Sequence, residues 1–138
     1  MIGLLVVTHG SLATELVEAT RRIVPRELPM CGISIEWDQD VDVARKEIAA
    51  ALERLDDGDG VVVATDMFGG TPTNLALTFL APGRVEIVTG VNLPMLVKFT
   101  NLDPECTLAQ AARVMAERGR AAISVAGEIL AGRETGGP

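Results

Sequence analysis

The chain has 138 residues, a length that suits a single domain. Its 12 Lys and Arg residues are outnumbered by 19 Asp and Glu residues, and the formal charge of −7 argues against a nucleic-acid-binding protein and against a basic helix lying on a membrane. Apolar residues make up 48 % of the chain, which excludes disorder and favours strands buried on both faces, as in a parallel α/β sheet.

The first half of the chain predicts the order strand, helix, strand, helix. The apolar run Ile2–Thr8 and the alternating run Cys31–Trp37 have the length and pattern of strands. Each run is followed by apolar residues at helical spacing. Pro25 closes the first helix, and either Asp40 or Asp42 can cap the second. The apolar faces of these two helices run from Leu12 to Ile23 and from Val41 to Leu55.

The next segment predicts two strands around a helix that begins in a glycine-rich loop. Val61–Ala64 is a short β-branched run, and Val85–Thr89 is a second run of strand length. Between them, Thr71 has the character of an N-cap, followed by Pro72 at the first helical position. We expect this helix to continue to about Leu80.

The last part of the chain predicts two helices and a weaker final strand. Asn92 is a candidate N-cap for the first helix. Thr107 and Gln110 have the spacing of a capping box for the second helix, and Gly119 is its expected stop. The apolar run Ala122–Val125 then predicts a fifth strand.

Together these elements predict one α/β domain with a doubly wound, mostly parallel sheet and helices on both faces. Right-handed crossovers favour a central first strand, with the strand order reversing between the first and third strands. Ligands of such sheets bind at the carboxyl ends of the strands, at that reversal. We expect the domain to span residues 1–130 and a flexible C-terminal tail to span residues 131–138.

Cysteine and histidine usage gives no sign of a metal site or a cofactor. Cys31 and Cys106 are far apart and belong to no metal-binding spacing, so we expect two reduced thiols. His9 is the single histidine. No signal peptide is visible at the N-terminus, and the longest uncharged stretch, Met67–Gly83, is interrupted by glycine and proline. We therefore expect a cytoplasmic protein with no cofactor and no metal.

Two polar side chains follow the first and third predicted strands. His9 and Asp66 each lie at the carboxyl end of a strand, and these strands are expected to be neighbours. A carboxylate that accepts from one imidazole nitrogen fixes the tautomer and leaves the other nitrogen as a nucleophile. The pair therefore predicts nucleophilic chemistry at His9, oriented by Asp66.

The loops around this pair have the character of a phosphate site. Gly10 and Ser11 precede one predicted helix, and Gly69, Gly70 and Thr71 precede another. Backbone N–H groups at helix starts, with no side chain in the way, bind phosphate oxygens. No cluster of acidic residues indicates a metal, so these five residues predict metal-free transfer of a phosphoryl group to nitrogen.

At these residues the sequence resembles the IIA domain of the mannose/fructose/sorbose family of the bacterial phosphotransferase system. The resemblance rests on three linked motifs, Val7–Gly10, Asp66–Asn74 and Gly90–Leu96, and extends over Ile2–Ile129. It implies a transferase that works through a phosphohistidine. In this family the histidine accepts a phosphoryl group from the phosphocarrier protein HPr and passes it to a IIB component, which serves membrane IIC and IID components.

The resemblance also assigns roles to individual residues. His9 is implied as the residue phosphorylated at Nε2, Asp66 as the carboxylate on Nδ1, and Gly70 and Thr71 as the phosphate cradle. The family forms homodimers that exchange the last strand, for which Ala121–Gly127 is the candidate. A IIB partner is expected to be a separate chain, because this chain ends soon after that strand. The implied rim of the site is Phe68, Asn92, Pro94 and Met95.

Two alternatives remain open at this point. The phosphoryl donor subunit of a dihydroxyacetone kinase shares the fold and the histidine after the first strand, although its second loop is less glycine-rich than Asp66–Pro72. The same phosphorylated domain can also serve as a regulatory module without transport, since phosphate adds about −1.5 to −2 charges whichever partner reads it.

Overall fold

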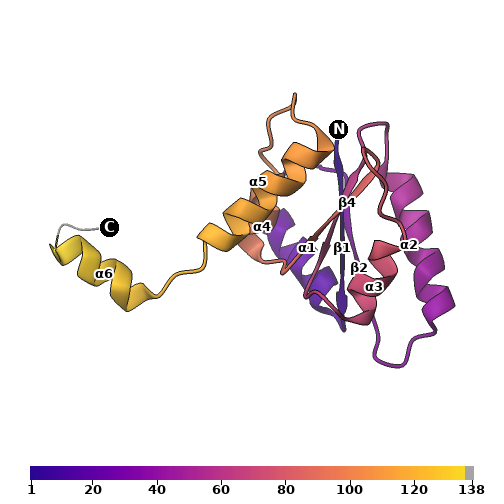
Figure 1. Ribbon diagram of the computed structural model, residues 1–138, viewed down its shortest axis with the longest axis horizontal. Coiled ribbons are helices and arrows are strands. Elements are labelled where there is room, and N and C mark those ends of the chain that lie inside the picture. Colours follow the sequence, from indigo (N-terminus) through magenta and orange to yellow (C-terminus); the bar gives the residue numbers. More distant parts are fainter. Residues whose placement is uncertain (136–138) are drawn as a thin grey trace.

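A four-stranded, all-parallel sheet forms the centre of the protein (Figure 1). The computed structural model describes residues 1–135. Strand β1 is central and the order reverses between β1 and β3, which confirms the prediction from crossover handedness. The strands, in their order across the sheet, are β2 (Met30–Ile35), β1 (Gly3–His9), β3 (Val61–Thr65) and β4 (Val85–Thr89).

Helices cover both faces of the sheet, as the apolar character of the strands predicts. On one face the buried residues come from α1 (Leu12–Ile23), α4 (Leu93–Phe99) and α5 (Leu108–Ala121). On the other face they come from α2 (Val41–Leu55) and α3 (Thr71–Leu77). The central strand β1 contributes alternate residues to the two clusters.

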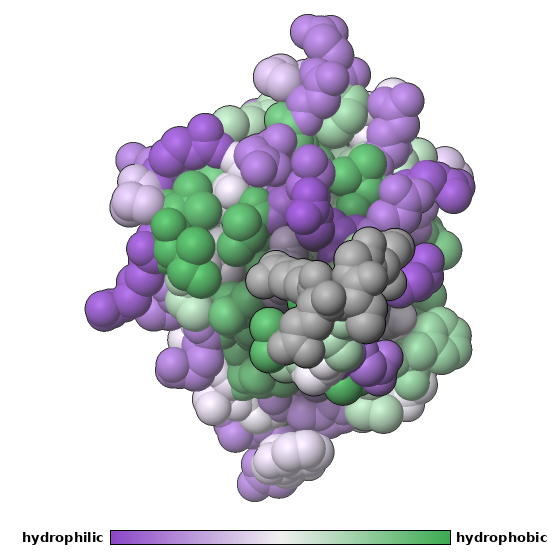
Figure 2. Space-filling model, turned by 90° about the vertical axis from the view of Figure 1, so that its left-hand side faces the viewer, coloured by the Kyte–Doolittle hydropathy of each residue, from purple (hydrophilic) through white to green (hydrophobic). Residues whose placement is uncertain are grey.

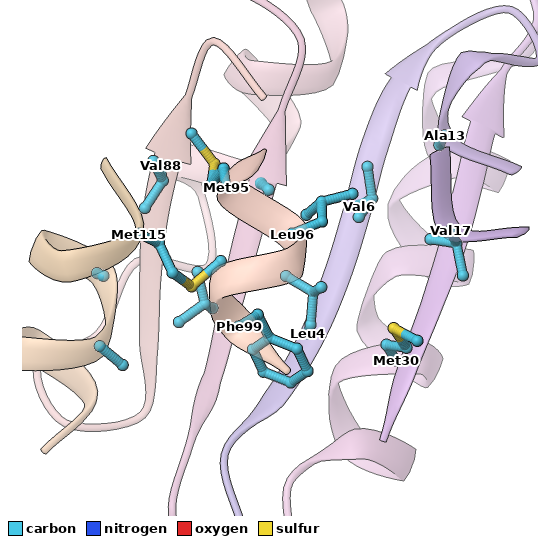
Figure 3. Close-up of a cluster of buried hydrophobic side chains, with 14 of the residues drawn as sticks. Leu4, Val6, Ala13, Val17, Met30, Val88, Met95, Leu96, Phe99 and Met115 are labelled. Carbon is cyan, nitrogen blue, oxygen red and sulfur yellow. The ribbon is translucent and has the colours of Figure 1, made fainter. Parts of the chain in front are cut away.

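The larger core lies between β1 and the helices α4 and α5 (Figure 3). Leu4, Leu96 and Met115 are fully buried there, and the buried ring of Phe99 belongs to the same cluster. Each such side chain contributes about 1.5–3 kcal/mol when it leaves water. This packing holds the strand whose last residue is His9.

Two element boundaries differ from the prediction near the carboxyl edge of the sheet. Strand β2 stops at Ile35, so Trp37 lies in the following turn and not in the strand. Helix α3 has Gly70 as its N-cap and ends at Leu77, before the expected Leu80. Alternation alone does not reveal that the ladder with β1 ends opposite His9, because that limit is set by the length of β1.

Gly119 is not the end of its helix. Helix α5 continues to Ala121, and Gly119 is buried against α4. A Cβ atom at this position would lie 3.0 Å from Met95 Cε and 3.2 Å from Asn92 Oδ1. The glycine therefore permits close packing of two helices. The other predicted caps of this region, Asn92 and the Thr107–Gln110 capping box, are confirmed.

The predicted fifth strand, Ala122–Val125, is absent. The segment is irregular and leads into α6 (Ala126–Thr135), which projects away from the body of the protein (Figure 1). A strand needs a partner edge, and this segment pairs with neither edge of the sheet within the described chain. The predicted tail, 131–138, starts inside α6, and its residues 136–138 lie outside the described residues.

Candidate functional site

His9 is the last residue of β1, and local hydrogen bonds fix its backbone. The next residue, Gly10, has a φ of 57° and donates its N–H to the Ile35 carbonyl at 2.9 Å. The buried Thr8 hydroxyl accepts from the Ala13 N–H at 2.6 Å and donates to the His9 carbonyl at 3.2 Å. Glycine suits the left-handed turn at position 10, which carries the chain from the strand into α1.

Asp66 lies beside His9 because β1 and β3 are paired in parallel. Val7 is opposite Thr65, so the residues that follow β3 reach the end of β1. The Asp66 Oδ2 atom lies 2.8 Å from His9 Nδ1 and accepts the His9 backbone N–H at 3.0 Å. The two side chains are 24 % and 14 % exposed, so the pair is largely shielded and still open to solvent. The predicted proximity of these residues is thus observed.

The pKa of the Asp66 carboxyl is lowered from its ordinary value of 3.8. Partial burial acts to raise this pKa, but the hydrogen bonds from the His9 backbone and imidazole outweigh burial. The backbone N–H of Met67 adds a further bond at 3.0 Å to Oδ1. Asp66 is therefore held as a carboxylate beside the imidazole.

The glycine-rich loop after β3 packs directly against the imidazole. A Cβ atom at Gly70 would lie 2.6 Å from His9 Cε1 and 2.9 Å from His9 Nε2, so only glycine fits here. The Thr73 hydroxyl donates to the Met67 carbonyl and shares a 2.7 Å hydrogen bond with the Thr65 hydroxyl. These two buried threonines hold the loop in place. Neither threonine was predicted from the sequence as a residue of the site.

Trp37 is a third residue of this site that was not predicted from the sequence. Its indole stacks on the His9 imidazole, with ring centroids 5.2 Å apart and planes inclined by 24°. The length of β1 is the sequence feature that could have located Trp37, because it limits how far β2 can pair. His9 is opposite Ile35, so ending β2 at that residue places Trp37 in the loop at the same edge of the sheet.

The other predicted site residues lie in different environments. Ser11, Phe68 and Gly69 are exposed on the loops that flank His9, and Thr71 is exposed at the start of α3. Ser11 makes no side-chain cap to α1. On the α4 side, Pro94 is exposed and Met95 is buried in the core. The Asn92 side chain is occupied, since it accepts from the Met95 N–H at 3.0 Å and donates to the Gly119 carbonyl at 2.9 Å.

Metal-binding clusters and membrane-spanning helices are both absent among residues 1–135. No group of three His, Cys, Asp or Glu side chains in this part of the chain is arranged to hold a metal ion. None of the described helices combines the length and the apolar character that crossing a membrane requires.

The sequence matches the family described as "PTS system fructose IIA component" over residues 3–116. The chain belongs to this family. The resemblance to the mannose/fructose/sorbose type of phosphotransferase-system IIA protein is thereby confirmed. A fructose-specific EIIA component of Bacillus subtilis is 28 % identical over 103 residues, which are 74 % of this chain and 70 % of that protein.

Further relatives and solved structures agree with this family. A mannose-specific EIIAB component of Escherichia coli is 28 % identical over 98 residues, which are 70 % of this chain and 30 % of that longer protein. A crystal structure of a PTS IIA protein associated with the fucose utilization operon of Streptococcus pneumoniae has a TM-score of 0.81 at 25 % identity, covering 94 % of this chain and 96 % of that one. A mannose/sorbose-specific IIA subunit of Enterococcus faecalis, at 23 % identity, has the same fold with a TM-score of 0.78, covering 89 % of this chain and 92 % of that one.

Proposed function

We propose that the chain is a phosphoryl carrier, which accepts a phosphoryl group from HPr on His9 Nε2 and passes it to a IIB component. The observation that carries this proposal is the 2.8 Å contact between Asp66 Oδ2 and His9 Nδ1. With Nδ1 bonded as the donor, Nε2 keeps its lone pair. Nε2 lies at the edge of the ring beside Gly70, where the loop leaves room for no side chain.

The transfer balances with these groups alone. The Nε2 lone pair forms a bond to phosphorus while the bond between phosphorus and the donor atom breaks, and its electron pair returns to the donor. The Nδ1 proton stays on the ring, so the imidazole gains positive charge beside the Asp66 carboxylate. A hydrogen bond to a charged group contributes about 1.5–3 kcal/mol, which favours the charged ring during transfer.

Backbone N–H groups around His9 support the phosphate role of the loops. Within residues 1–135, the N–H groups of Gly70 and Thr71 donate to no protein acceptor. Helix α1, which is 12 residues long, begins directly after Gly10 and Ser11 and directs its N-terminal end toward the same edge of the sheet. A helix N-terminus favours an anion by about 0.3–1 kcal/mol.

The alternatives share this site and differ in the partner. The phosphoryl donor subunit of a dihydroxyacetone kinase would pass the group to a different acceptor, and the phosphorylation state of a regulatory module would be read by a partner without serving transport. The family match favours the IIA component. The glycines of the loop 66–72 favour it as well, since Gly70 is the residue that packs against Nε2.

The test is the intact mass of the protein after incubation with phosphoenolpyruvate, enzyme I and HPr. We expect a gain of one phosphoryl group that is lost in acid and is absent from His9→Ala. Addition of a IIB component should then discharge the wild-type protein. No gain of mass, under conditions where HPr itself becomes phosphorylated, would contradict the proposal and favour the dihydroxyacetone kinase alternative or a different phosphoryl donor.

We further propose that two copies of the chain associate through the segment 122–130. Ile123 and Val125 are 77 % and 61 % exposed, and Ile129 and Leu130 add further exposed apolar surface. Figure 2 looks onto the side from which α6 projects and shows hydrophobic side chains gathered there. An apolar surface of this kind, on a projecting arm, is typical of a protein interface.

The oligomeric state in solution tests this association. Sedimentation should give a dimer for the wild type and a monomer for the double variant Ile123→Asp, Val125→Asp. Ile23→Asp is the matched control, because Ile23 is also exposed and lies at the end of α1, outside the segment. A monomeric wild type, or a double variant that remains dimeric, would contradict the association.

A further inference from the structure

Trp37 is exposed to solvent, which is unusual for a tryptophan. It is the single tryptophan of the chain and is 80 % exposed, so it plays no part in either buried cluster. Its ring contact is with His9, at a centroid distance of 5.2 Å. Trp is the most favourable aromatic partner for a cation within about 6 Å of its ring. Trp37 therefore packs against the histidine and not against the core.

The turn that carries Trp37 is held at both ends. The Glu36 carbonyl accepts the Gln39 N–H at 3.1 Å, and the Gln39 Oε1 atom accepts the Glu36 N–H at 3.1 Å. The Gln39 amide also donates to Glu47 on α2 at 3.0 Å. Asp40 then caps α2. The turn is thus fixed to the end of β2 and to the first turns of α2, which keeps an exposed indole in one place.

Three contacts together restrict the imidazole of His9. Asp66 holds Nδ1, the Gly70 backbone lies against the Cε1–Nε2 edge, and the Trp37 indole covers the face of the ring. A reactive side chain whose rotamer is locked by its neighbours loses less freedom when it reacts. Without the indole, the face of the ring is open to water and the ring can rotate away from Asp66.

We propose that Trp37 is a positioning residue for His9. Its indole keeps the imidazole in the orientation that bonds Asp66, and its π face stabilises the positive charge that the ring gains when Nε2 binds phosphorus. Gln39 acts through Trp37, because it holds the turn. This inference rests on the proposed phosphoryl transfer for its kinetic part, whereas the orientation of the imidazole is a property of the unphosphorylated protein.

The kinetic test compares Trp37→Leu, Trp37→Phe and Gln39→Ala in phosphorylation by phospho-HPr. Trp37→Leu should lower the rate constant at saturating donor about tenfold, with a much smaller change in the donor concentration that gives half the maximal rate. Trp37→Phe should recover most of the rate, since it retains an aromatic face. Gln39→Ala should give an intermediate loss.

The control for the kinetic test is Val43→Ala. Val43→Ala removes another exposed side chain, on the first turn of α2, and should leave the rate unchanged. An unchanged rate constant in Trp37→Leu would overturn the proposal. An effect confined to the half-saturating donor concentration would also overturn it, because Trp37 would then serve docking and not positioning.

A spectroscopic test separates this inference from the proposed function. His9 is the single histidine, so its imidazole signals in a ¹⁵N-labelled protein are assigned by composition. In the wild type we expect an Nδ1-protonated ring with protons shifted by the indole ring current. Trp37→Leu should broaden the Nδ1–H signal and remove the shift. An Nδ1–H signal that stays as sharp in Trp37→Leu as in the wild type would overturn positioning, whether or not the protein accepts phosphate.

Discussion

A single carboxylate oxygen of Asp66 accepts two hydrogen bonds from His9, one from the imidazole at 2.8 Å and one from the backbone N–H at 3.0 Å. Asp66 therefore holds both the ring and the strand end that carries it. A substitution at Asp66 therefore affects both the orientation of the imidazole and the hydrogen bond that connects the end of β1 to the loop after β3. If Asp66 served only to cap its own loop, the hydrogen bond that it accepts from the Met67 N–H would be sufficient.

Asp66→Asn should slow phosphorylation by about 100-fold or more and leave measurable transfer, because the nucleophile remains while control of its tautomer is lost. The measurement is the rate of mass gain with phospho-HPr as donor. Glu117→Gln, an exposed acid-to-amide change on α5, is the control and should behave like the wild type. A wild-type rate in Asp66→Asn would show that the carboxylate serves only as a cap.

The lowered pKa of Asp66 predicts how stability depends on pH. The folded state favours the carboxylate, so this stabilisation is present above the ordinary pKa of 3.8 and is lost as the pH falls through the lower folded value. Urea denaturation of the wild type and Asp66→Asn at a series of pH values measures it. We expect a constant stability difference above about pH 5 that shrinks in more acidic solution. A difference that grows in acid would contradict the sign.

Gly70→Ala should abolish most phosphorylation with little effect on the rest of the fold. The new Cβ would lie 2.6 Å from His9 Cε1, a distance that forces the imidazole or the loop to move. The loss should be at least tenfold, as a misplacement of about 1 Å can cost about 100-fold in rate. Lys46→Ala, a change at an exposed side chain on α2 outside the site, should keep the wild-type rate. Equal rates in both variants would contradict the tight approach.

Thr8→Val should reduce both stability and the rate of phosphorylation. The buried hydroxyl bonds the Ala13 N–H at the start of α1, and its loss leaves that donor unsatisfied at a cost of about 1–3 kcal/mol. Thermal unfolding measures the first effect and mass gain the second. Thr8→Ser keeps the hydroxyl and should recover most of both. If Thr8→Val is as stable as the wild type, the hydroxyl does not cap the helix.

Much of the fold was readable from local patterns. The four strands β1 to β4 are apolar runs bounded by turn residues, and Asp40, Asn92 and Thr107 all cap helices as their side chains predict. The approach of Asp66 to His9 followed from topology, because parallel strands deliver their carboxyl ends to one edge. These features depend on residues close in sequence or on general rules of chain handedness.

The sequence by itself therefore determined the α/β class, the strand order and the pairing of His9 with Asp66. Tertiary structure decided that Trp37 lies on the imidazole, that Gly70 packs against its edge and that Gly119 lets α4 and α5 approach. It also decided that the apolar segment after α5 leaves the sheet and does not join it. Each of these outcomes depends on which distant surfaces meet, and periodicity along the chain carries no information about such contacts.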